Sequence, residues 1–194
     1  MRHTIAIFIL IIFGTISCQG PKSKRQALSE SITEFKNNVT LEKQVFIPKA
    51  YIEREVDTLL RNGYRVKIKT YADMSQSVLI SKIKDTVNYQ THYRNFNFDI
   101  RVEKEGQLIY EEHFNKAKAN ALLGYRDNYE ADSPFYNFHS LGVLESIQVD
   151  DEPALKDEVL IDVVYSIPET DRFAQHTLFI NEDGNLQMVH VTQN

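Results

Sequence analysis

Three sets of side chains in this sequence have types and spacing that could do chemistry. The first is Cys18, which is the only cysteine among the 194 residues. The second is a pair of histidines near the C-terminus, His176 and His190. The third is a stretch rich in aromatic and acidic residues over positions 125–139. They suggest, respectively, acylation of a thiol, metal binding by imidazoles, and ligand recognition by aromatic faces and carboxylates.

Cys18 ends a short export signal. Arg2 gives a basic start, Ile5–Phe13 is an uninterrupted apolar run, and the small Ser17 precedes the cysteine. This arrangement is typical of a secretory signal. A cysteine at the cleavage site is typical of the lipobox of bacterial lipoproteins, although Thr15 stands where a lipobox usually carries leucine. We therefore predict cleavage after residue 17, lipidation of Cys18 and anchoring in a membrane.

Two alternatives explain less of this segment. A membrane-spanning helix needs about 20 apolar residues, and even the generous stretch Thr4–Ser17 is shorter. An ordinary secretory signal with an unmodified cysteine would leave a free thiol, which is unusual in an oxidising compartment. Lipidation accounts both for the position of Cys18 and for the absence of a second cysteine.

The two histidines fall opposite each other when the C-terminal hairpin is paired through its turn. Directly opposed residues have Cβ atoms about 5 Å apart. At that spacing His176 and His190 could share a divalent metal if a third ligand came from elsewhere. The alternative is that both imidazoles are exposed or hydrogen-bonded and hold no ligand. Apart from this candidate site, the sequence predicts no cofactor.

The stretch over residues 125–139 is the second candidate site. Aromatic faces beside carboxylates suit recognition of a carbohydrate or a peptide, and long loops in compact domains are often functional. The alternative is that these aromatic residues cover the open end of a sheet. The candidate ligand-binding residues are Tyr125, Asp127, Tyr129, Glu130, Phe135 and Tyr136.

Other constellations of catalysis and binding are missing from the sequence. It contains no P-loop, GxGxxG or HExxH motif and no GxSxG motif. Acylation would remove Cys18 from thiol catalysis and from zinc–thiolate sites. Carboxylates such as Asp127 and Glu130 would serve a glycosidase only at separations of about 5–9 Å. The net charge of −5 gives no electrostatic reason to bind nucleic acid or an anionic membrane surface.

The elements that must position these residues begin with a helix. Ser23 and Gln26 have the spacing of a capping box. Four apolar residues then recur at the spacing of one helical face, namely Leu28, Ile32, Phe35 and Val39. We expect this helix to dock on a sheet.

Three hairpins share one turn pattern, two polar residues followed by Gly63, Gly106 or Gly184. The pattern predicts three-residue loops that end in a left-handed glycine. The registers that follow give each hairpin one apolar face. The predicted opposed pairs are Leu60–Tyr64, Thr58–Val66 and Val56–Ile68; Val102–Leu108, Ile100–Tyr110 and Phe96–Phe114; and Ile180–Leu186 and Leu178–Met188.

Further strands are predicted at Gln76–Ile83, Leu141–Val149 and Val159–Ile167, and the last is apolar on both faces and therefore central. Capping signals predict a short helix over Asn115–Leu123. The fold class is thus mostly β (α+β). It is an antiparallel meander of about eight or nine strands forming a curved sheet, sandwich or partial barrel, with an N-terminal helix and one short mid-chain helix. The predicted organisation is a signal peptide over 1–17, a tether over 18–26 and one globular domain over 27–194.

The chain resembles lipoproteins of unknown function that are common in Bacteroidetes-type bacteria. The resemblance is carried by the signal ending at Ser17–Cys18, the hairpin Asp57–Ile68 and the stretch Tyr93–Ile100. It implies a location, and no activity or site residue. Surface-exposed lipoproteins of these bacteria usually have an acidic stretch after the lipidated cysteine, whereas this chain is basic over residues 22–25. The resemblance therefore implies an outer-membrane lipoprotein that faces the periplasm.

Together these features predict a non-enzymatic, lipid-anchored envelope domain. Its partner would be a peptide, a glycan or an envelope protein, and not a nucleic acid. The alternative is an envelope hydrolase that uses acidic or histidine side chains near the 125–139 loop. A deep pocket with converging acids and histidines would favour the hydrolase, whereas a shallow aromatic groove or an exposed apolar patch would favour the binding domain.

Overall fold

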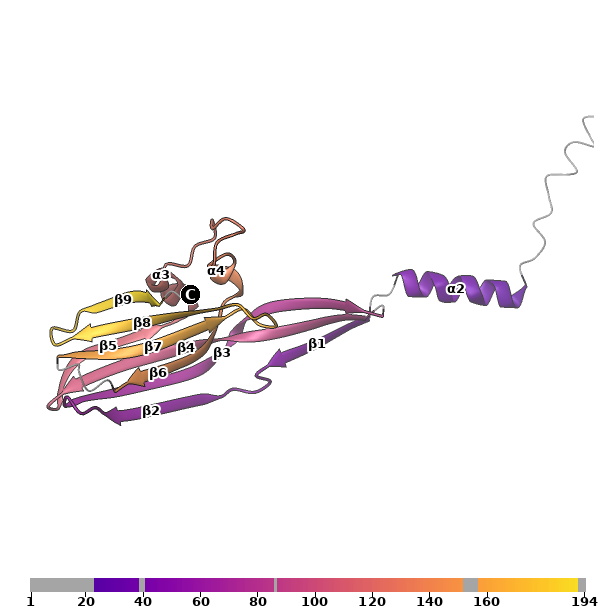
Figure 1. The fold of residues 1–194 in the computed structure, drawn as a ribbon. Helices are drawn as coiled ribbons and strands as arrows, with labels where there is room; N and C mark the ends of the chain where they lie inside the picture. The colour runs from indigo at the N-terminus through magenta and orange to yellow at the C-terminus, as the bar shows by residue number, and fades with distance from the viewer. Residues whose placement is uncertain (1–22, 39–40, 86, 152–156, 192–194) are drawn as a thin grey trace, which may run out of the picture. The chain divides into compact units, whose positions relative to one another are not determined.

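Strands dominate the described part of the chain. The computed structural model describes residues 23–38, 41–85, 87–151 and 157–191. Within them the chain forms nine strands in two sheets and three helices (Figure 1), which confirms the predicted β-rich α+β class. The chain divides into two units. One holds residues 1–41 and 85–87, and the other holds residues 42–84 and 88–194.

The first unit contains helix α2 (Lys24–Asn38). The predicted capping box is present. The Gln26 N–H donates to Ser23 Oγ at 3.2 Å, and the Ser23 N–H donates to Gln26 Oε1 at 3.3 Å. Docking of this helix on a sheet stays a prediction, and Cys18 lies outside the described residues.

Sheet A, in the second unit, has the order β1–β4–β3–β2, and β5 also pairs with β4. Strands β2 to β5 follow one another as the predicted meander, whereas β1 leaves it to pair with β4. The strands are β1 (Leu41–Ile47), β2 (Glu53–Leu59), β3 (Tyr64–Lys84), β4 (Val87–Lys104) and β5 (Gln107–Phe114).

Sheet B is a second antiparallel meander, in the order β6–β7–β8–β9. Its strands are β6 (Val143–Asp150), β7 (Glu158–Ser166), β8 (Phe173–Asn181) and β9 (Leu186–Val191). β7 is an interior strand, as its apolar residues on both faces predicted. Its alternate residues are buried, and Leu160 and Val164 on the other face are half-buried.

The two sheets share one apolar core. Side chains alternate between the faces of a strand, and the inward-facing residues of β3, β4, β7 and β8 are almost completely buried. They include Tyr64, Val66, Ile68, Phe98, Ile100, Val102, Val159, Ile161, Val163, Leu178 and Ile180. Burying a side chain of this size stabilises a fold by about 1.5–3 kcal/mol, so this layer holds the sheets together.

The first and third hairpins have the predicted registers. Val56 lies opposite Ile68 in the first, and Leu178 lies opposite Met188 in the third. Gly63 and Gly184 both have positive φ, 86° and 76°. A left-handed residue therefore ends each loop, as the turn pattern predicted.

The predicted register of the second hairpin is wrong by two residues. Val102 lies opposite Tyr110, and Phe98 rather than Phe96 lies opposite Phe114. Glu105 and Gly106 both have positive φ, 51° and 80°, so they form a two-residue loop of the type that favours tight hairpins. A bulge after Val102 supplies the remaining shift. Tyr110 and Phe114 therefore stay on the core side, whereas Leu108, beyond the bulge, lies opposite Glu103 and is exposed.

Two short helices, α3 (Lys116–Leu123) and α4 (Phe138–Leu141), add residues to the core. The Lys118 N–H donates to Asn115 Oδ1 at 2.9 Å, and Gly124 is left-handed with φ 72°, so both predicted caps of α3 are confirmed. α4 was not predicted from the sequence. At only four residues it is too short for a periodic pattern.

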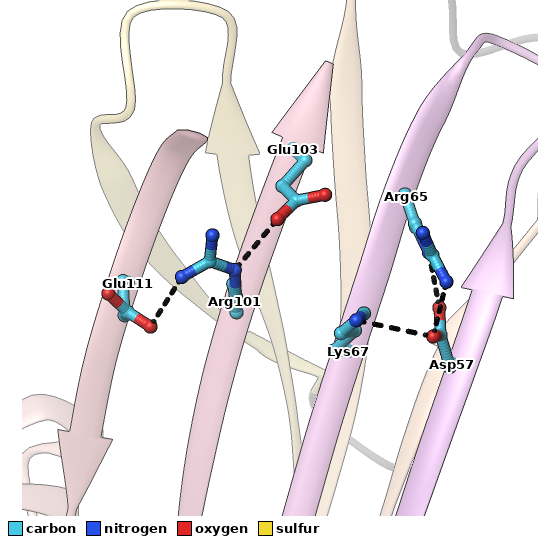
Figure 2. A network of polar contacts seen from close by, with 6 residues as sticks. All are labelled: Asp57, Arg65, Lys67, Arg101, Glu103 and Glu111. Atoms are coloured by element: carbon cyan, nitrogen blue, oxygen red, sulfur yellow. Dashed lines mark hydrogen bonds and ion pairs between the residues drawn. The ribbon is translucent and has the colours of Figure 1, made fainter. Parts of the chain in front are cut away.

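The outer face of sheet A carries ion pairs. Figure 2 shows Arg101 between Glu103 and Glu111, at 2.8 and 2.9 Å. It also shows Asp57 accepting from Arg65 at 2.7 Å and lying 3.5 Å from Lys67. The guanidinium of Arg65 lowers the pKa of Asp57. These pairs lie opposite the core, where water and salt screen them.

Alanine at Gly184 should destabilise the protein more than alanine at Gly63. A Cβ in the left-handed region costs about 1–2 kcal/mol at either position. At Gly184 it would also lie 2.4 Å from the carbonyl oxygen of Ile109 in β5, whereas nothing lies within 4 Å at Gly63. We expect Gly184→Ala to lower the free energy of unfolding by at least about 1 kcal/mol more than Gly63→Ala. Urea unfolding measures both losses, and equal losses would contradict a close approach of the β8–β9 turn to β5.

Candidate functional site

A groove of about 450 Å³ lies between an edge of sheet A and an edge of sheet B. β2 ends the strand order of sheet A, and β6 ends that of sheet B. Residues from both strands line the groove, together with residues of β3 and β4. The lining residues are Ile52, Glu53, Arg54, Val56, Ile68, Thr70, Phe96, Leu144, Glu145, Ser146, Ile147 and Gln148.

The floor of the groove is apolar and continuous with the core. Val56 and Ile68 are directly opposed in the β2–β3 pair, and Ile68 and Leu144 are buried core residues. Phe96 and Ile147 pack against the same core. A ligand that enters the groove would therefore bury apolar surface without rearranging the sheets.

One wall of the groove is the edge of strand β6. Five consecutive residues, 144–148, line it. Successive side chains of a strand point to opposite faces, so five residues in a row can border one groove only if the edge of the strand faces it. β6 pairs with β7 and with no other described strand. An edge of this kind presents backbone N–H and C=O groups that an added strand can pair with.

Two charged side chains of opposite sign are available at the groove. Arg54 shares the inward face of β2 with Val56, and Glu145 follows Leu144 on β6. Neither has an ion-pair partner among the described residues. Glu53 is different, since it accepts from Tyr51 at 2.7 Å and lies 3.3 Å from Lys69. The Tyr51 hydroxyl and the Lys69 ammonium lower the pKa of Glu53.

The β2–β3 turn is bound to the connection between β6 and β7. Arg61 Nε lies 3.4 Å from Asp151 Oδ2. Asn62 Nδ2 donates to the Glu158 carbonyl at 3.0 Å, and the Tyr64 hydroxyl donates to the Asp157 carbonyl at 3.2 Å. These contacts fix the two edges relative to each other at one end of the groove.

The predicted ligand-binding stretch is divided between core and surface. Tyr125 is buried, and its hydroxyl lies 2.5 Å from His176 Nε2. Its ring packs on Phe135, Phe138 and Tyr165 at centroid distances of 5.3–6.0 Å. Tyr125 thus belongs to the aromatic end of the core.

The rest of this stretch is more accessible. The Tyr129 hydroxyl donates to the Gly124 carbonyl at 2.8 Å, and Tyr136 is half-buried beside Arg172, which donates to its carbonyl at 2.6 Å. Asp127 and Glu130 are exposed. Ligand binding by these residues stays a prediction.

The two histidines are Cα partners in the β8–β9 pair, as predicted. His176 is completely buried and uses Nε2 in its contact with Tyr125. Within the described ranges, no group of three or more His, Cys, Asp or Glu side chains could hold a metal ion. Metal binding by His176 and His190 therefore stays a prediction that needs a ligand from elsewhere.

One lysine outside the groove has a strongly shifted pKa. Burial lowers the pKa of Lys116 to about 8. Its ammonium donates to the Ser140 carbonyl at 2.8 Å, which ties α3 to the end of α4. This contact is structural.

The sequence analysis did not predict the groove, although one residue of the sequence indicated an exposed sheet edge there. In the predicted and confirmed register Val56 faces the core, and Arg54, two residues earlier, must share that face. A charged residue on the inward face of a strand is typical of an exposed sheet edge. The neighbouring edge of β6 left no such signal, because its position beside β2 depends on how the sheets pack.

No protein-family model matches the chain, and no curated protein matches it. None of the helices in the described residues is long and apolar enough to cross a membrane.

Removal of the Tyr125 hydroxyl should destabilise the core, whereas removal of the Tyr165 hydroxyl should not. Both rings are almost fully buried. Tyr125→Phe takes a buried hydrogen-bond partner from His176, which costs about 1–3 kcal/mol. The Tyr165 hydroxyl has no hydrogen-bond partner among the described residues, so Tyr165→Phe should leave the free energy of unfolding nearly unchanged. Urea unfolding compares the two, and equal losses would contradict the contact with His176.

Proposed function

We propose that this protein is a lipid-anchored cell-envelope domain that binds an extended peptide segment of a partner protein in the groove between β2 and β6. The observation that carries the proposal is the combination of an apolar floor with a wall made of an unpaired strand edge. An extended peptide can satisfy both, because its backbone pairs with the edge while alternate side chains enter the groove.

The edge of β6 suits strand addition better than the edge of β2. Four of the seven residues of β2 are charged, and Arg54 points inward. Charges placed in this way discourage pairing with another strand. β6 has two charged residues in eight and alternates apolar with polar residues. The peptide is therefore expected to pair with β6 and to meet Arg54 across the groove.

A peptide also fits the groove better than a glycan does. The volume of about 450 Å³ lies in the range of natural ligand pockets, and five of the six apolar lining residues are aliphatic. Glycan sites commonly offer aromatic faces, whereas Phe96 is the one aromatic residue of this lining. The free charges on Arg54 and Glu145 suit a peptide that carries a charged side chain of each sign.

The proposed location of the protein in the cell envelope is argued from the sequence. The signal that ends at Cys18 supports export and lipidation, and the basic residues over 22–25 support retention on the periplasmic side of the outer membrane. The partner would then be another envelope protein with an accessible extended segment.

Peptide selection tests the groove directly. Panning a displayed peptide library on the mature chain should yield segments with alternating apolar residues. Val56→Trp fills the groove, so it should weaken binding of a selected peptide at least about tenfold, which corresponds to 1.4 kcal/mol. Leu108→Trp is the matched control, since Leu108 is 49% exposed and Val56 is 47% exposed, and Leu108 lies on β5 away from the groove. Fluorescence anisotropy measures both affinities.

The same peptides test strand addition. Methylation of alternate backbone nitrogens removes the donors that would pair with β6, and one of the two alternating patterns should abolish binding while the other is tolerated. Failure to select any peptide, equal affinity of Val56→Trp and the wild type, or indifference to both methylation patterns would overturn the proposal.

Cys18→Ser should release the protein from the membrane. In cells supplied with labelled fatty acid, the wild-type chain should carry the label and sediment with membranes. The Cys18→Ser chain should lose the label and appear in the soluble periplasmic fraction. A labelled or membrane-bound variant would show that another residue provides the anchor.

A further inference from the structure

The two strand edges that border the groove run in the same direction. The Arg61 N–H donates to Asp151 Oδ1 at 3.3 Å, and the side chains of these two residues form an ion pair. Arg61 lies just after the end of β2 at Leu59, and Asp151 directly follows the end of β6 at Asp150. β2 and β6 therefore both run toward this contact, which lies at one end of the groove.

Arg54 and Glu145 lie toward the other end of the groove. Arg54 is seven residues before Arg61, and Leu144 is seven residues before Asp151. Because each residue of an extended strand advances by about 3.3 Å, Arg54 on β2 is about level with Leu144 and Glu145 on β6. The lining of the groove agrees, since all three of these residues border it.

A bulge at Glu145 limits the free edge of β6. Leu144 pairs with Tyr165 and Ser146 pairs with Val164, so Glu145 is the extra residue between two consecutive pairs. After the bulge, the register with β7 is continuous to the end of the strand. A bulge disrupts the hydrogen-bond ladder of its strand. An added strand can therefore pair with β6 after the bulge, and one of its ends lies at Glu145.

An added strand is expected to run antiparallel to β6. The pairs β6–β7, β7–β8 and β8–β9 are all antiparallel, and antiparallel pairing is slightly more stable per residue than parallel pairing. In this direction the amino end of the peptide lies toward the Arg61–Asp151 contact. Its carboxyl end lies toward Glu145 and Arg54.

The pleat of β6 then decides which way each peptide side chain points. Directly opposed residues of an antiparallel pair share a face. Ile147 and Val149 pack against the core, so the peptide residues opposite them face the apolar floor. The residue opposite Ser146 faces outward beside Glu145. The residue after it faces inward again, level with Arg54.

The surroundings of Arg54 suit a carboxylate. Thr70 is the Cα partner of Arg54 and lines the same groove, so a guanidinium and a hydroxyl are both available as donors. Alternation along β2 directs Glu53 to the other face, where it lies 3.3 Å from Lys69. A peptide carboxylate at this level would form charge-assisted hydrogen bonds with the guanidinium.

The surroundings of Glu145 suit a basic side chain. Glu145 lines the groove and also a hollow at the β7–β8 turn, together with Glu169, Asp171 and Arg172. Glu169 pairs with Lys82, and the Arg172 guanidinium donates to two backbone carbonyls. Three carboxylates thus stand against two cations, which leaves an excess of negative charge beside Glu145.

We propose that the groove selects peptides in the order apolar–any–apolar–basic–acidic, bound antiparallel to β6. The two apolar residues enter the floor, the basic residue contacts Glu145 and the acidic residue contacts Arg54. This inference rests on the proposed peptide binding and adds to it a direction and an order of charges.

Two peptides of identical composition test the order. Ser-Val-Thr-Val-Lys-Glu-Ser and its reverse, Ser-Glu-Lys-Val-Thr-Val-Ser, each carry an N-terminal fluorescein and an amidated C-terminus. Fluorescence anisotropy measures their binding to the mature chain with Cys18→Ser, which lacks the acyl group. We expect the first peptide to bind at least about tenfold more tightly, because the reverse peptide could reach Glu145 and Arg54 only through parallel pairing.

Exchange of charges tests the two contacts separately. Arg54→Glu should weaken the first peptide about tenfold or more, and lysine in place of the peptide glutamate should restore binding. Glu145→Lys should weaken it similarly, and glutamate in place of the peptide lysine should restore binding. Glu55→Lys is the matched control, because Glu55 is next to Arg54 on β2 but opposes Lys69 on the other face. This control should bind both original peptides as the wild type does.

Equal or tighter binding of the reverse peptide would overturn this inference. So would a loss that the exchanged peptide does not restore, or an equal loss in Glu55→Lys. If both orders bind equally and Val56→Trp weakens both, the groove binds peptides without reading their order, and only this inference fails. The same holds if neither order binds but library peptides do. If no peptide is selected at all, the proposed function fails as well.

Discussion

Burial of alternate side chains between the two sheets is the constraint on which the rest of the structure depends. Val66 and Ile68 of β3 and Ile161 and Val163 of β7 are all removed from water in one layer. Because strand side chains alternate, this choice also decides which residues face outward. The ion pairs of Asp57, Arg101 and their partners (Figure 2) occupy the outer face as a direct consequence.

The same constraint determines which surfaces remain open. A two-layer arrangement of open sheets leaves strand edges, and two of these edges border the groove beside β2 and β6. Sheet A also has strands longer than the sandwich, so β3 and β4 extend beyond the layer that would cover them. The groove is therefore a part of the second unit where apolar side chains remain available to a ligand. The proposed function assigns a partner to this surface, which the core did not cover.

The aromatic end of the core shows how a polar pair can be built into this layer. His176 and Tyr125 are both buried, and each would be costly there without a hydrogen-bond partner. Their mutual contact at 2.5 Å offsets that cost and joins the 125–139 stretch to sheet B. Residues that look like a ligand surface by composition are thus partly core. Composition alone does not distinguish a binding loop from a loop that covers a sheet end.

The sequence by itself determined the local features of this protein. Capping by Ser23 and Asn115, the left-handed Gly63 and Gly184, and the inward faces of the strands follow from interactions among residues close in the chain. The predicted register of the second hairpin was wrong because Glu105 adopts positive φ and a bulge follows Val102. Packing, rather than the composition of the turn, decides between the two-residue loop and the three-residue loop. Only the tertiary structure placed β6 beside β2, put Tyr125 on His176 and extended β3 beyond its pairing with β2. These relations join residues distant in the chain, and their energies come from burial, which no local pattern specifies.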